Sequence, residues 1–379
     1  FIWNIIMNIA FLCREDFFRK FGGDTNQVLK YKKYWESDKN HRVDIITKQN
    51  FEINYDLFIV VNIDRFLETF YFLRKLKKAN KLHKTSILCI HHNFDDVVFF
   101  EKNIKKGFSG LLASIGGYFL REKAKDLILS FKNRVFRVSA LRELCSSQSF
   151  FLNSIKDDVL FIFLSEGEKF SLEKDFNLKL KEENLIFTKN GCEMESALPV
   201  SNNEYEYDIL VSGRIEPRKN QIRIINDLCT TNYKICFVGG ANENNAIYFD
   251  KFMELINRFP NMMYLGKVSP EEMTRLYYKS KIHISASWFE VSSLVDLEAY
   301  YCGCSVISSK NGYTSELLGE RVFYFDPKEN ENLSAVVGDA MKAIPVKDYK
   351  EFIAMHHDWE INSLKLLRDL EYKIEGRNV

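Results

Sequence analysis

Residues 208–221 read DILVSGRIEPRKNQ, and this stretch decides the fold. It begins with a short apolar run, reaches Gly213, and continues through a basic loop into a helical pattern. A buried strand that passes through a glycine turn into a helix is the repeating unit of parallel α/β sheets. The stretch therefore predicts a parallel sheet with Arg214 and Lys219 in the loop after a strand, where open α/β sheets bind ligands.

The same alternation of short apolar runs and longer helical patterns extends along the whole chain. It predicts an α/β fold with two series of parallel strands, hence two Rossmann-like domains. Helices are expected at 65–80, 269–279 and 292–302, the second after the start signal Ser269-Pro270. The expected strands are residues 7–12, 43–47, 57–61, 86–90, 135–139, 159–164 and 185–187, then 208–212, 234–238, 262–265, 281–285, 304–307 and 322–325.

A chain of 379 residues has ample length for two domains. The turn pair Asn190-Gly191 and the polar stretch after it predict a boundary there. We expect an N-terminal domain over 1–190 and a C-terminal domain over 191–345. The segment 346–379 is expected to form a helix that packs back on the first domain.

The overall charge of +1 hides an asymmetry between the two halves. Residues 1–190 hold 32 Lys and Arg against 24 Asp and Glu, a net of +8, and residues 191–379 hold 21 against 28, a net of −7. The positive excess lies mainly in residues 71–137 and suits either an anionic membrane or a solvated helix face. Within it, the apolar piece 108–120 is expected either at a membrane surface or as a buried helix.

Eight cysteines without a CxxC pair indicate reduced thiols and a cytoplasmic setting. The apolar segment 1–13 resembles neither a signal peptide nor a membrane span, and Met7 is the expected start of translation. No cluster with metal-ligand spacing accompanies the tandem histidines His91 and His92, so no metal site is expected.

Two glutamates eight residues apart, Glu290 and Glu298, flank the loop before a predicted helix. The start of that helix offers unpaired N–H groups to an anion, while both carboxylates can reach hydroxyl groups of one ligand. Arg214 and Lys219 suit a pyrophosphate. In the first half, Gly22-Gly23 after the first strand allows close backbone approach to a ligand, and His91 follows the strand 86–90.

Together, Glu-x7-Glu, the Gly-Arg-x4-Lys loop and the early Gly-Gly turn resemble the family-4 (group 1) retaining glycosyltransferases of GT-B fold. The resemblance is strongest from Asp208 to Pro327, and the N-terminal features look like a bacterial polysaccharide-assembly branch. It implies two Rossmann-like domains whose parallel sheets face each other across a cleft. The chain departs from the family pattern at Val291, Ser292, Ser293 and Val295, which bears on the identity of the donor sugar.

The resemblance also implies a role for each matching residue. Arg214 and Lys219 would hold the donor diphosphate, Glu298 the nucleotide ribose, and Glu290 the transferring sugar. Ser293 and Leu294 would contact the donor through their backbone, and His91 would contact its sugar from the first domain. The residues also assigned to the donor site are Gly22, Gly23, Gly213 and Asn190.

The expected reaction moves a sugar from a UDP- or GDP-sugar to a hydroxyl of a glycan or lipid-linked glycan, without a cofactor or metal. A cytoplasmic protein, with possible contact to the inner face of an anionic membrane, is expected; nucleic acid is not an expected partner. Two alternatives remain: a nucleotide-sugar 2-epimerase and a non-catalytic sugar-nucleotide-binding subunit. A Rossmann oxidoreductase is disfavoured because no strand is followed by GxGxxG.

Overall fold

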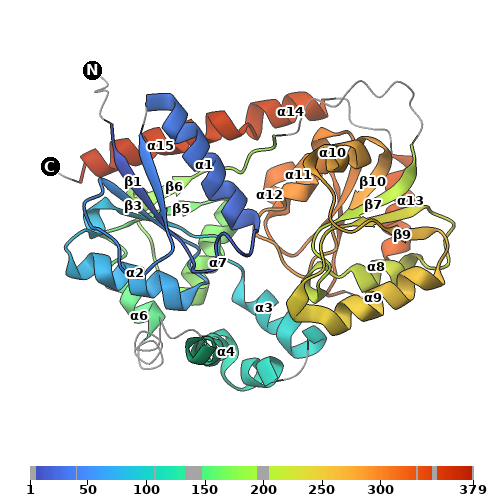
Figure 1. The fold of residues 1–379 in the computed structure, drawn as a ribbon, viewed down its shortest axis with the longest axis horizontal. Helices are drawn as coiled ribbons and strands as arrows, with labels where there is room; N and C mark the ends of the chain where they lie inside the picture. Colours follow the sequence, from blue (N-terminus) through green and yellow to red (C-terminus); the bar gives the residue numbers. More distant parts are fainter. Residues whose placement is uncertain are drawn as a thin grey trace. The chain divides into compact units, whose positions relative to one another are not determined.

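The computed structural model describes residues 6–39, 41–105, 108–132, 147–193, 205–329, 332–343 and 348–377. The chain divides into two compact units (Figure 1). The N-terminal unit comprises Phe1–Asn190 together with Trp359–Val379, and the C-terminal unit comprises Gly191–Asp358. Each unit is built on its own six-stranded sheet.

The N-terminal unit has a parallel sheet in the order β2-β1-β3-β4-β5-β6. The order changes direction between β1 and β3, so the loops after these strands diverge at that point of the sheet. Its elements are β1 (Asn8–Leu12), α1 (Gly23–Lys39), β2 (Arg42–Ile46), β3 (Leu57–Val61), α2 (Phe66–Lys78), β4 (Thr85–Leu88), α3 (Phe94–Phe100), α4 (Phe108–Lys132), α6 (Gln148–Asn153), β5 (Leu160–Phe163), α7 (Glu166–Phe176), β6 (Leu185–Phe187) and α15 (Trp359–Glu375).

The C-terminal unit has a parallel sheet in the order β12-β11-β10-β7-β8-β9. Its order changes direction between β7 and β10, the position at which doubly wound sheets bind ligands. Its elements are β7 (Tyr207–Ser212), α8 (Gln221–Leu228), β8 (Ile235–Val238), α9 (Ala246–Arg258), β9 (Met262–Tyr264), α10 (Pro270–Tyr278), β10 (Ser280–Ile284), α11 (Leu294–Tyr301), β11 (Ser305–Ser309), α12 (Thr314–Leu318), β12 (Phe323–Phe325), α13 (Leu333–Lys342) and α14 (Tyr349–His356).

Apolar cores cover both faces of the C-terminal sheet. Along β7, Ile209 and Val211 point into one core and Leu210 into the other, as the two-residue period of a strand requires. The first core includes residues of α8, α9 and α13, and the second includes residues of α10, α11, α12 and α14. Because both faces are covered, the strands are mainly apolar. Buried polar residues such as Ser212, His283 and Ser308 lie near the carboxyl ends of the strands.

The end of the chain differs from the expected single helix over 346–379. Helix α14 ends at His356 and α15 begins at Trp359. The backbone N–H of Cys192 donates to the carbonyl of His357, within the C-terminal unit. Only α15 belongs to the N-terminal unit, where Trp35 of α1 donates its ring N–H to the carbonyl of Ser363 at 2.8 Å. The helix that packs on the N-terminal sheet therefore starts at Trp359, later than 346.

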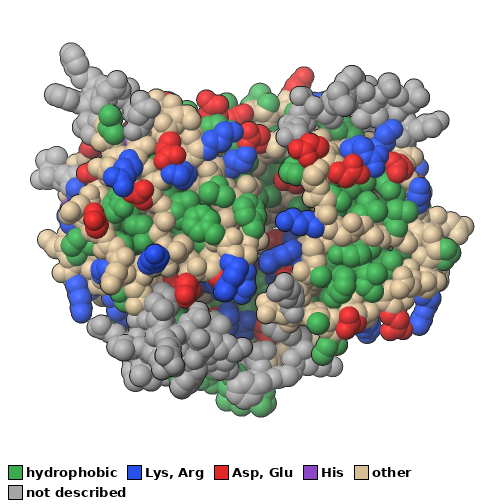
Figure 2. All heavy atoms as spheres, in the orientation of Figure 1, with side chains coloured by type: hydrophobic (Ala, Val, Ile, Leu, Met, Phe, Trp, Pro, Cys, Tyr) green, Lys and Arg blue, Asp and Glu red, His purple; other side chains and the backbone are tan. Residues whose placement is uncertain are grey.

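The predicted strands coincide with those of the structure to within one or two residues, except residues 135–139, which lie outside the described residues. The fold class is confirmed: an α/β protein with two parallel sheets. On the face drawn in Figure 2, Lys and Arg side chains lie among Asp and Glu side chains on both units. No helix in the described part of the chain is long and apolar enough to span a bilayer.

Candidate functional site

The loop after β7 carries the basic residues singled out in the sequence. Gly213 follows the strand with a φ of +138°, a conformation that favours glycine. A short 3₁₀ turn over Pro217–Lys219 then leads to α8. The amide of Gln221 donates to the carbonyl of Arg214 at 2.8 Å and ties the start of the helix to the loop. The loop is therefore held in shape from both ends.

The segment after β10 lies against this loop, because β7 and β10 are neighbours in the sheet. The backbone N–H of Trp288 donates to the carbonyl of Arg218 at 2.9 Å. The Arg218 guanidinium in turn donates to the carbonyl of Phe289 at 3.1 Å. These reciprocal bonds bring Arg214, Lys219 and Glu290 to one end of the C-terminal sheet.

Three cations surround two carboxylates at this end of the sheet. Glu290 accepts from Lys219, from Arg218 at 3.0 Å and from the Ser287 hydroxyl at 3.0 Å. Glu216 lies 3.3 Å from Arg218 and 3.8 Å from Arg214. Burial acts to raise the pKa of Glu216, but Arg218 and Arg214 lower it overall. The cluster has one more cation than carboxylate, so it can accept a further anion.

A glycine fixes the position of Glu290. Gly312 has a φ of +128°, and a Cβ there would lie 2.0 Å from the carbonyl oxygen of Glu290. The two residues form an isolated parallel bridge, and the Glu290 N–H donates to the carbonyl of Asn311 at 3.2 Å. Only glycine allows this approach of the two backbones.

The N-terminus of α11 lies directly after this segment. Ser293 occupies the N-cap position, and its side chain makes no capping hydrogen bond to the helix that Leu294 begins. The side-chain atoms Ser292 Oγ, Ser293 Oγ and Asn311 Nδ2 are buried, and among the described residues none has a hydrogen-bond partner. Buried polar atoms are normally satisfied, so this group indicates a place where a polar ligand or water completes the bonding.

Glu298 lies one turn into α11 and is half-buried. Its carboxylate accepts from the Tyr277 hydroxyl at 3.2 Å. Glu290 and Glu298 are therefore held by different partners, Glu290 by the basic loop and Glu298 by a tyrosine of α10.

Gly22 and Gly23, the two glycines singled out in the N-terminal unit, lie at the start of α1. Gly23 is exposed, and a Cβ there would meet no atom within 4 Å. A Cβ on Gly22 would lie 2.9 Å from the Asp24 carboxylate, which is paired with Arg14 at 2.8 Å. The Asp24 carboxylate therefore lies at the start of α1, where a donor diphosphate was expected to bind. The roles of Gly22 and Gly23 stay predictions.

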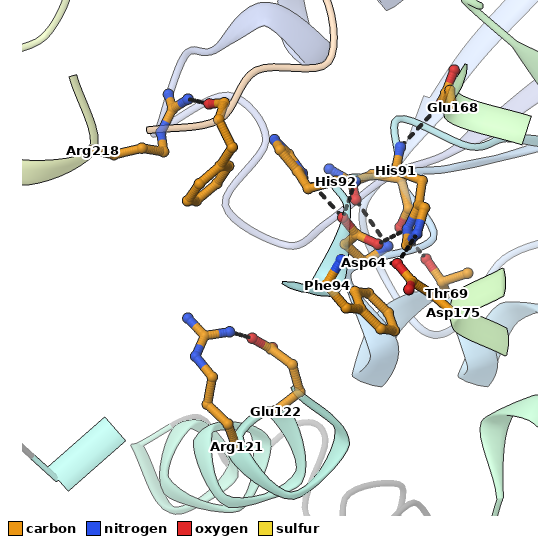
Figure 3. A network of polar contacts seen from close by, with 12 residues as sticks. Asp64, Thr69, His91, His92, Phe94, Arg121, Glu122, Glu168, Asp175 and Arg218 are labelled. Carbon is orange, nitrogen blue, oxygen red and sulfur yellow. Dashed lines mark hydrogen bonds and ion pairs between the residues drawn. The ribbon is translucent and has the colours of Figure 1, made fainter. Parts of the chain in front are cut away.

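His91 requires a correction. Its ring is fully buried, with Nδ1 2.6 Å from Asp64 and Nε2 3.0 Å from Asp175 (Figure 3). Burial acts to lower the pKa of His91, but the two carboxylates raise it to about 9. Both ring nitrogens are occupied, so this side chain is not placed to contact a donor sugar. His92 is a quarter exposed and also pairs with Asp64, at 3.0 Å.

The surrounding carboxylates hold the loop after β4 as well as the ring. The backbone N–H groups of residues 91, 92 and 94 donate to Glu168, Asp64 and Asp175 at 2.8, 2.9 and 2.8 Å. Ile90 has a φ of +47°, an unfavourable conformation for a β-branched residue. Burial raises the pKa of Glu168 to about 7. The cluster thus maintains a strained loop, which is a structural role for His91.

The remaining predicted residue, Asn190, is buried at the end of the N-terminal unit. Its assignment to the donor site stays a prediction. Over the described ranges, no group of three or more His, Cys, Asp or Glu side chains is arranged to hold a metal ion.

Three residues that form ion pairs in these two clusters were not predicted from the sequence. Arg218 bridges Glu216 and Glu290, and its place beside Lys219 in the loop was the available signal. Asp64 and Asp175 enclose His91 from positions 27 and 84 residues away along the chain. No local pattern marks such distant partners.

A comparison with known protein families gives a match in the C-terminal part of the chain. Residues 197–353 match the family model described as glycosyl transferases group 1. The phosphatidylinositol N-acetylglucosaminyltransferase GPI3 subunit of Saccharomyces cerevisiae is 22% identical to this chain over 160 residues. That alignment covers 40% of this chain and only 35% of the length of the yeast protein.

Solved structures resemble the chain over nearly its whole length. Sucrose-phosphate synthase from Thermosynechococcus elongatus is 14% identical, with a TM-score of 0.68 over 95% of this chain and 97% of that one. Anabaena HepE, solved with UDP-glucose, is 16% identical, with a TM-score of 0.63 over 97% of this chain and 100% of that one. These similarities establish the GT-B glycosyltransferase fold.

Proposed function

Because residues 197–353 belong to the glycosyl transferases group 1, we propose that the chain transfers a sugar from a UDP- or GDP-sugar to a hydroxyl acceptor. The observation that carries the proposal is the cluster of Arg214, Arg218 and Lys219 in the same unit as the start of α11, where the N-cap side chain makes no capping hydrogen bond. A helix N-terminus and a surplus of cations together suit a diphosphate. The solved HepE complex with UDP-glucose supports a donor of this class.

The cluster would act on the leaving group. As the bond between the anomeric carbon and the phosphate oxygen breaks, negative charge develops on the diphosphate and positive charge on the sugar. Fixed Arg and Lys side chains stabilise the first without a proton transfer or a metal. In the retaining reaction the acceptor oxygen attacks the face that the phosphate leaves, and its proton passes to a phosphate oxygen. Glu298 would bind the ribose and Glu290 the transferring sugar.

Release of UDP or GDP over a panel of nucleotide-sugars, with and without EDTA, tests this proposal. We expect turnover with one donor class, unchanged by EDTA, and an α-linked product from an α-linked donor. Absence of nucleotide release and of nucleotide binding across the panel would refute it.

A non-catalytic sugar-nucleotide-binding subunit is the second candidate. The observation in its favour is that Glu290 already pairs with Lys219 and Arg218, in a loop that departs from the family pattern at 291–295. This alternative requires binding of a nucleotide-sugar without transfer to any acceptor. A 2-epimerase would convert the donor alone, without an acceptor, and the same panel detects it.

We further propose that the acceptor is a lipid-linked glycan at an anionic membrane, bound through the kinked helix α4. Leu111 and Ile115, four residues apart on one face, are 57% and 72% exposed. Lys125 lies beyond the kink, is 43% exposed and pairs with Glu122 at 3.0 Å. Arg121 pairs with Glu101 at 2.5 Å and lies largely buried. Exposed apolar side chains on one helix face suit an interfacial helix.

Flotation with vesicles of anionic or neutral lipid tests the membrane contact. We expect binding to anionic vesicles at low salt, lost in Ile115→Asp and retained in Ile247→Asp, which alters an 88% exposed isoleucine of the C-terminal unit. Equal binding of both variants, or none by the unaltered protein, would contradict it.

A further inference from the structure

A row of buried polar side chains crosses the C-terminal unit and ends at Glu298. It joins the carboxyl ends of β11, β10 and β7 to helices α10 and α11. The successive contacts are Ser308 Oγ to Asp296 Oδ2 at 2.7 Å, Asp296 Oδ1 to His283 Nδ1 at 3.3 Å, His283 Nε2 to Ser212 Oγ at 2.9 Å, Ser212 Oγ to Tyr277 Oη at 3.0 Å, and Tyr277 Oη to Glu298 Oε2 at 3.2 Å.

The row lies inside an apolar environment. Asp296, His283 and Tyr277 are fully buried, and the Tyr277 ring belongs to the core that also contains Leu276 and Leu297. Phenylalanine would fill the same space without a polar group to satisfy. The hydroxyl of Tyr277 is therefore not required for packing.

The direction of the hydrogen bonds follows from proton counting. An ionised Glu298 can only accept, so the single Tyr277 proton points to it. The Tyr277 oxygen must then accept from Ser212, and Ser212 must accept from a protonated His283 Nε2. The other ring nitrogen, Nδ1, lies 3.3 Å from Asp296 Oδ1, and among the described residues it makes no hydrogen bond. The row thus has one consistent direction, from His283 to Glu298.

We infer that Tyr277 is a positioning residue that holds the Glu298 carboxylate in its ribose-binding orientation, and that His283 and Ser212 keep the Tyr277 proton directed at Glu298. The inference rests on the proposed function, in which Glu298 binds the nucleotide. Burial and the negative charge of Glu298 raise the pKa of Tyr277 well above its ordinary value, so the hydroxyl remains a donor. Asp296, two residues before Glu298, faces the sheet and anchors the far end of the row.

Titration calorimetry with UDP and with GDP on the full chain tests the inference. We expect Tyr277→Phe to weaken binding of the preferred nucleotide roughly tenfold, the loss typical of one hydrogen bond to a charged group. Because the ribose contact is made equally before and during transfer, KM for the donor rises and kcat stays nearly constant. Tyr324→Phe is the matched control: it removes a tyrosine hydroxyl bonded to the Gly319 carbonyl at 2.6 Å and should bind nucleotide normally.

A double-mutant cycle separates positioning from loss of stability. If Tyr277 acts through Glu298, Tyr277→Phe should have no further effect in a Glu298→Ala background. Ser212→Ala, one step further along the row, should weaken binding less than Tyr277→Phe. Additive effects, or a fall in kcat at unchanged KM, would overturn the positioning role.

The outcomes also separate this inference from the proposed function. If the unaltered protein binds neither UDP nor GDP, both fail. If Glu298→Ala binds as well as the unaltered protein, the ribose role of Glu298 fails and the inference with it, while donor binding stands. If Glu298→Ala weakens binding and Tyr277→Phe does not, the inference alone is wrong.

Discussion

Each unit has a charged cluster at the carboxyl ends of its parallel strands, and the two clusters have opposite arrangements. In the C-terminal unit, cations surround Glu216 and Glu290, and the side chain of Arg214 is 47% exposed. In the N-terminal unit, carboxylates surround His91, which is fully buried (Figure 3). The first cluster has positive charge left for a ligand, whereas the second uses its charges on its own loop.

This difference shows that position at a strand end does not by itself define a binding site. Asp64, Asp175 and Glu168 each accept from a backbone N–H of the loop after β4. The two aspartates also contact the His91 ring, and Glu168 also accepts from the backbone N–H of Leu164. Their bonding capacity is spent within the protein. Ser292 and Ser293, at the start of α11, have buried hydroxyls with no partner among the described residues. The unsatisfied hydroxyl groups beside the cations are the reason to propose a ligand site in the C-terminal unit.

The largest expected effect is on the stability of the N-terminal cluster. His91→Ala leaves Asp64 and Asp175 buried without their shared cation, so we expect a loss of about 3–5 kcal/mol in the free energy of unfolding. Urea titration measures it, with His92→Ala as the control that changes stability by less than about 1 kcal/mol. If His91→Ala folds with normal stability but loses transfer, His91 is a ligand-binding residue after all.

The second largest effect is on the rate of sugar transfer, through the C-terminal cluster. Lys219→Ala removes a cation expected to stabilise the leaving diphosphate, and we expect kcat/KM to fall about 10²–10³-fold. Initial rates of nucleotide release measure it. Lys251→Ala, on the exposed face of α9, should retain full activity. Unchanged transfer in Lys219→Ala would show that the basic loop does not stabilise the leaving diphosphate.

The cluster around His91 should also make the stability of the N-terminal unit depend on pH. The pKa of His91 is raised to about 9 from its ordinary 6.5. Its stabilising contribution is therefore complete below pH 6.5 and is lost as the pH rises through 9, a change of roughly 3 kcal/mol. Glu168, with its pKa raised to about 7, adds a fall in the same direction at lower pH.

Urea titration between pH 6 and 9.5 measures this slope. In His91→Gln, the loss of unfolding free energy above pH 7 should be absent, because the glutamine amide does not titrate. A slope equal to that of the unaltered protein would show that His91 is neutral in the folded state.

The smallest effect concerns the geometry around Glu290. Gly312→Ala places a methyl group against the Glu290 carbonyl in a backbone conformation that alanine disfavours, so we expect about 1–3 kcal/mol of destabilisation with reduced transfer. Gly338→Ala is the control, since a Cβ in α13 meets no atom within 4 Å and alanine favours the helix. Activity unaffected by Gly312→Ala would mean that Glu290 tolerates displacement.

The parallel strands and the basic loop can be predicted from sequence alone, because both depend on local patterns. Short apolar runs are buried as strands wherever a sheet is covered on both faces, and Arg214 and Lys219 follow a strand by their place in the chain. The helix break before Trp359 was missed because it depends on packing: α15 docks on α1 through the Trp35 contact to Ser363.

Only the tertiary structure decided what each polar residue does. His91 lies beside Asp175, 84 residues away, and Glu298 is joined to His283 through Ser212 and Tyr277. Such partners meet because parallel strands bring distant segments to one edge of a sheet. Whether a histidine is enclosed or exposed depends on those partners, and no spacing in the sequence contains that information.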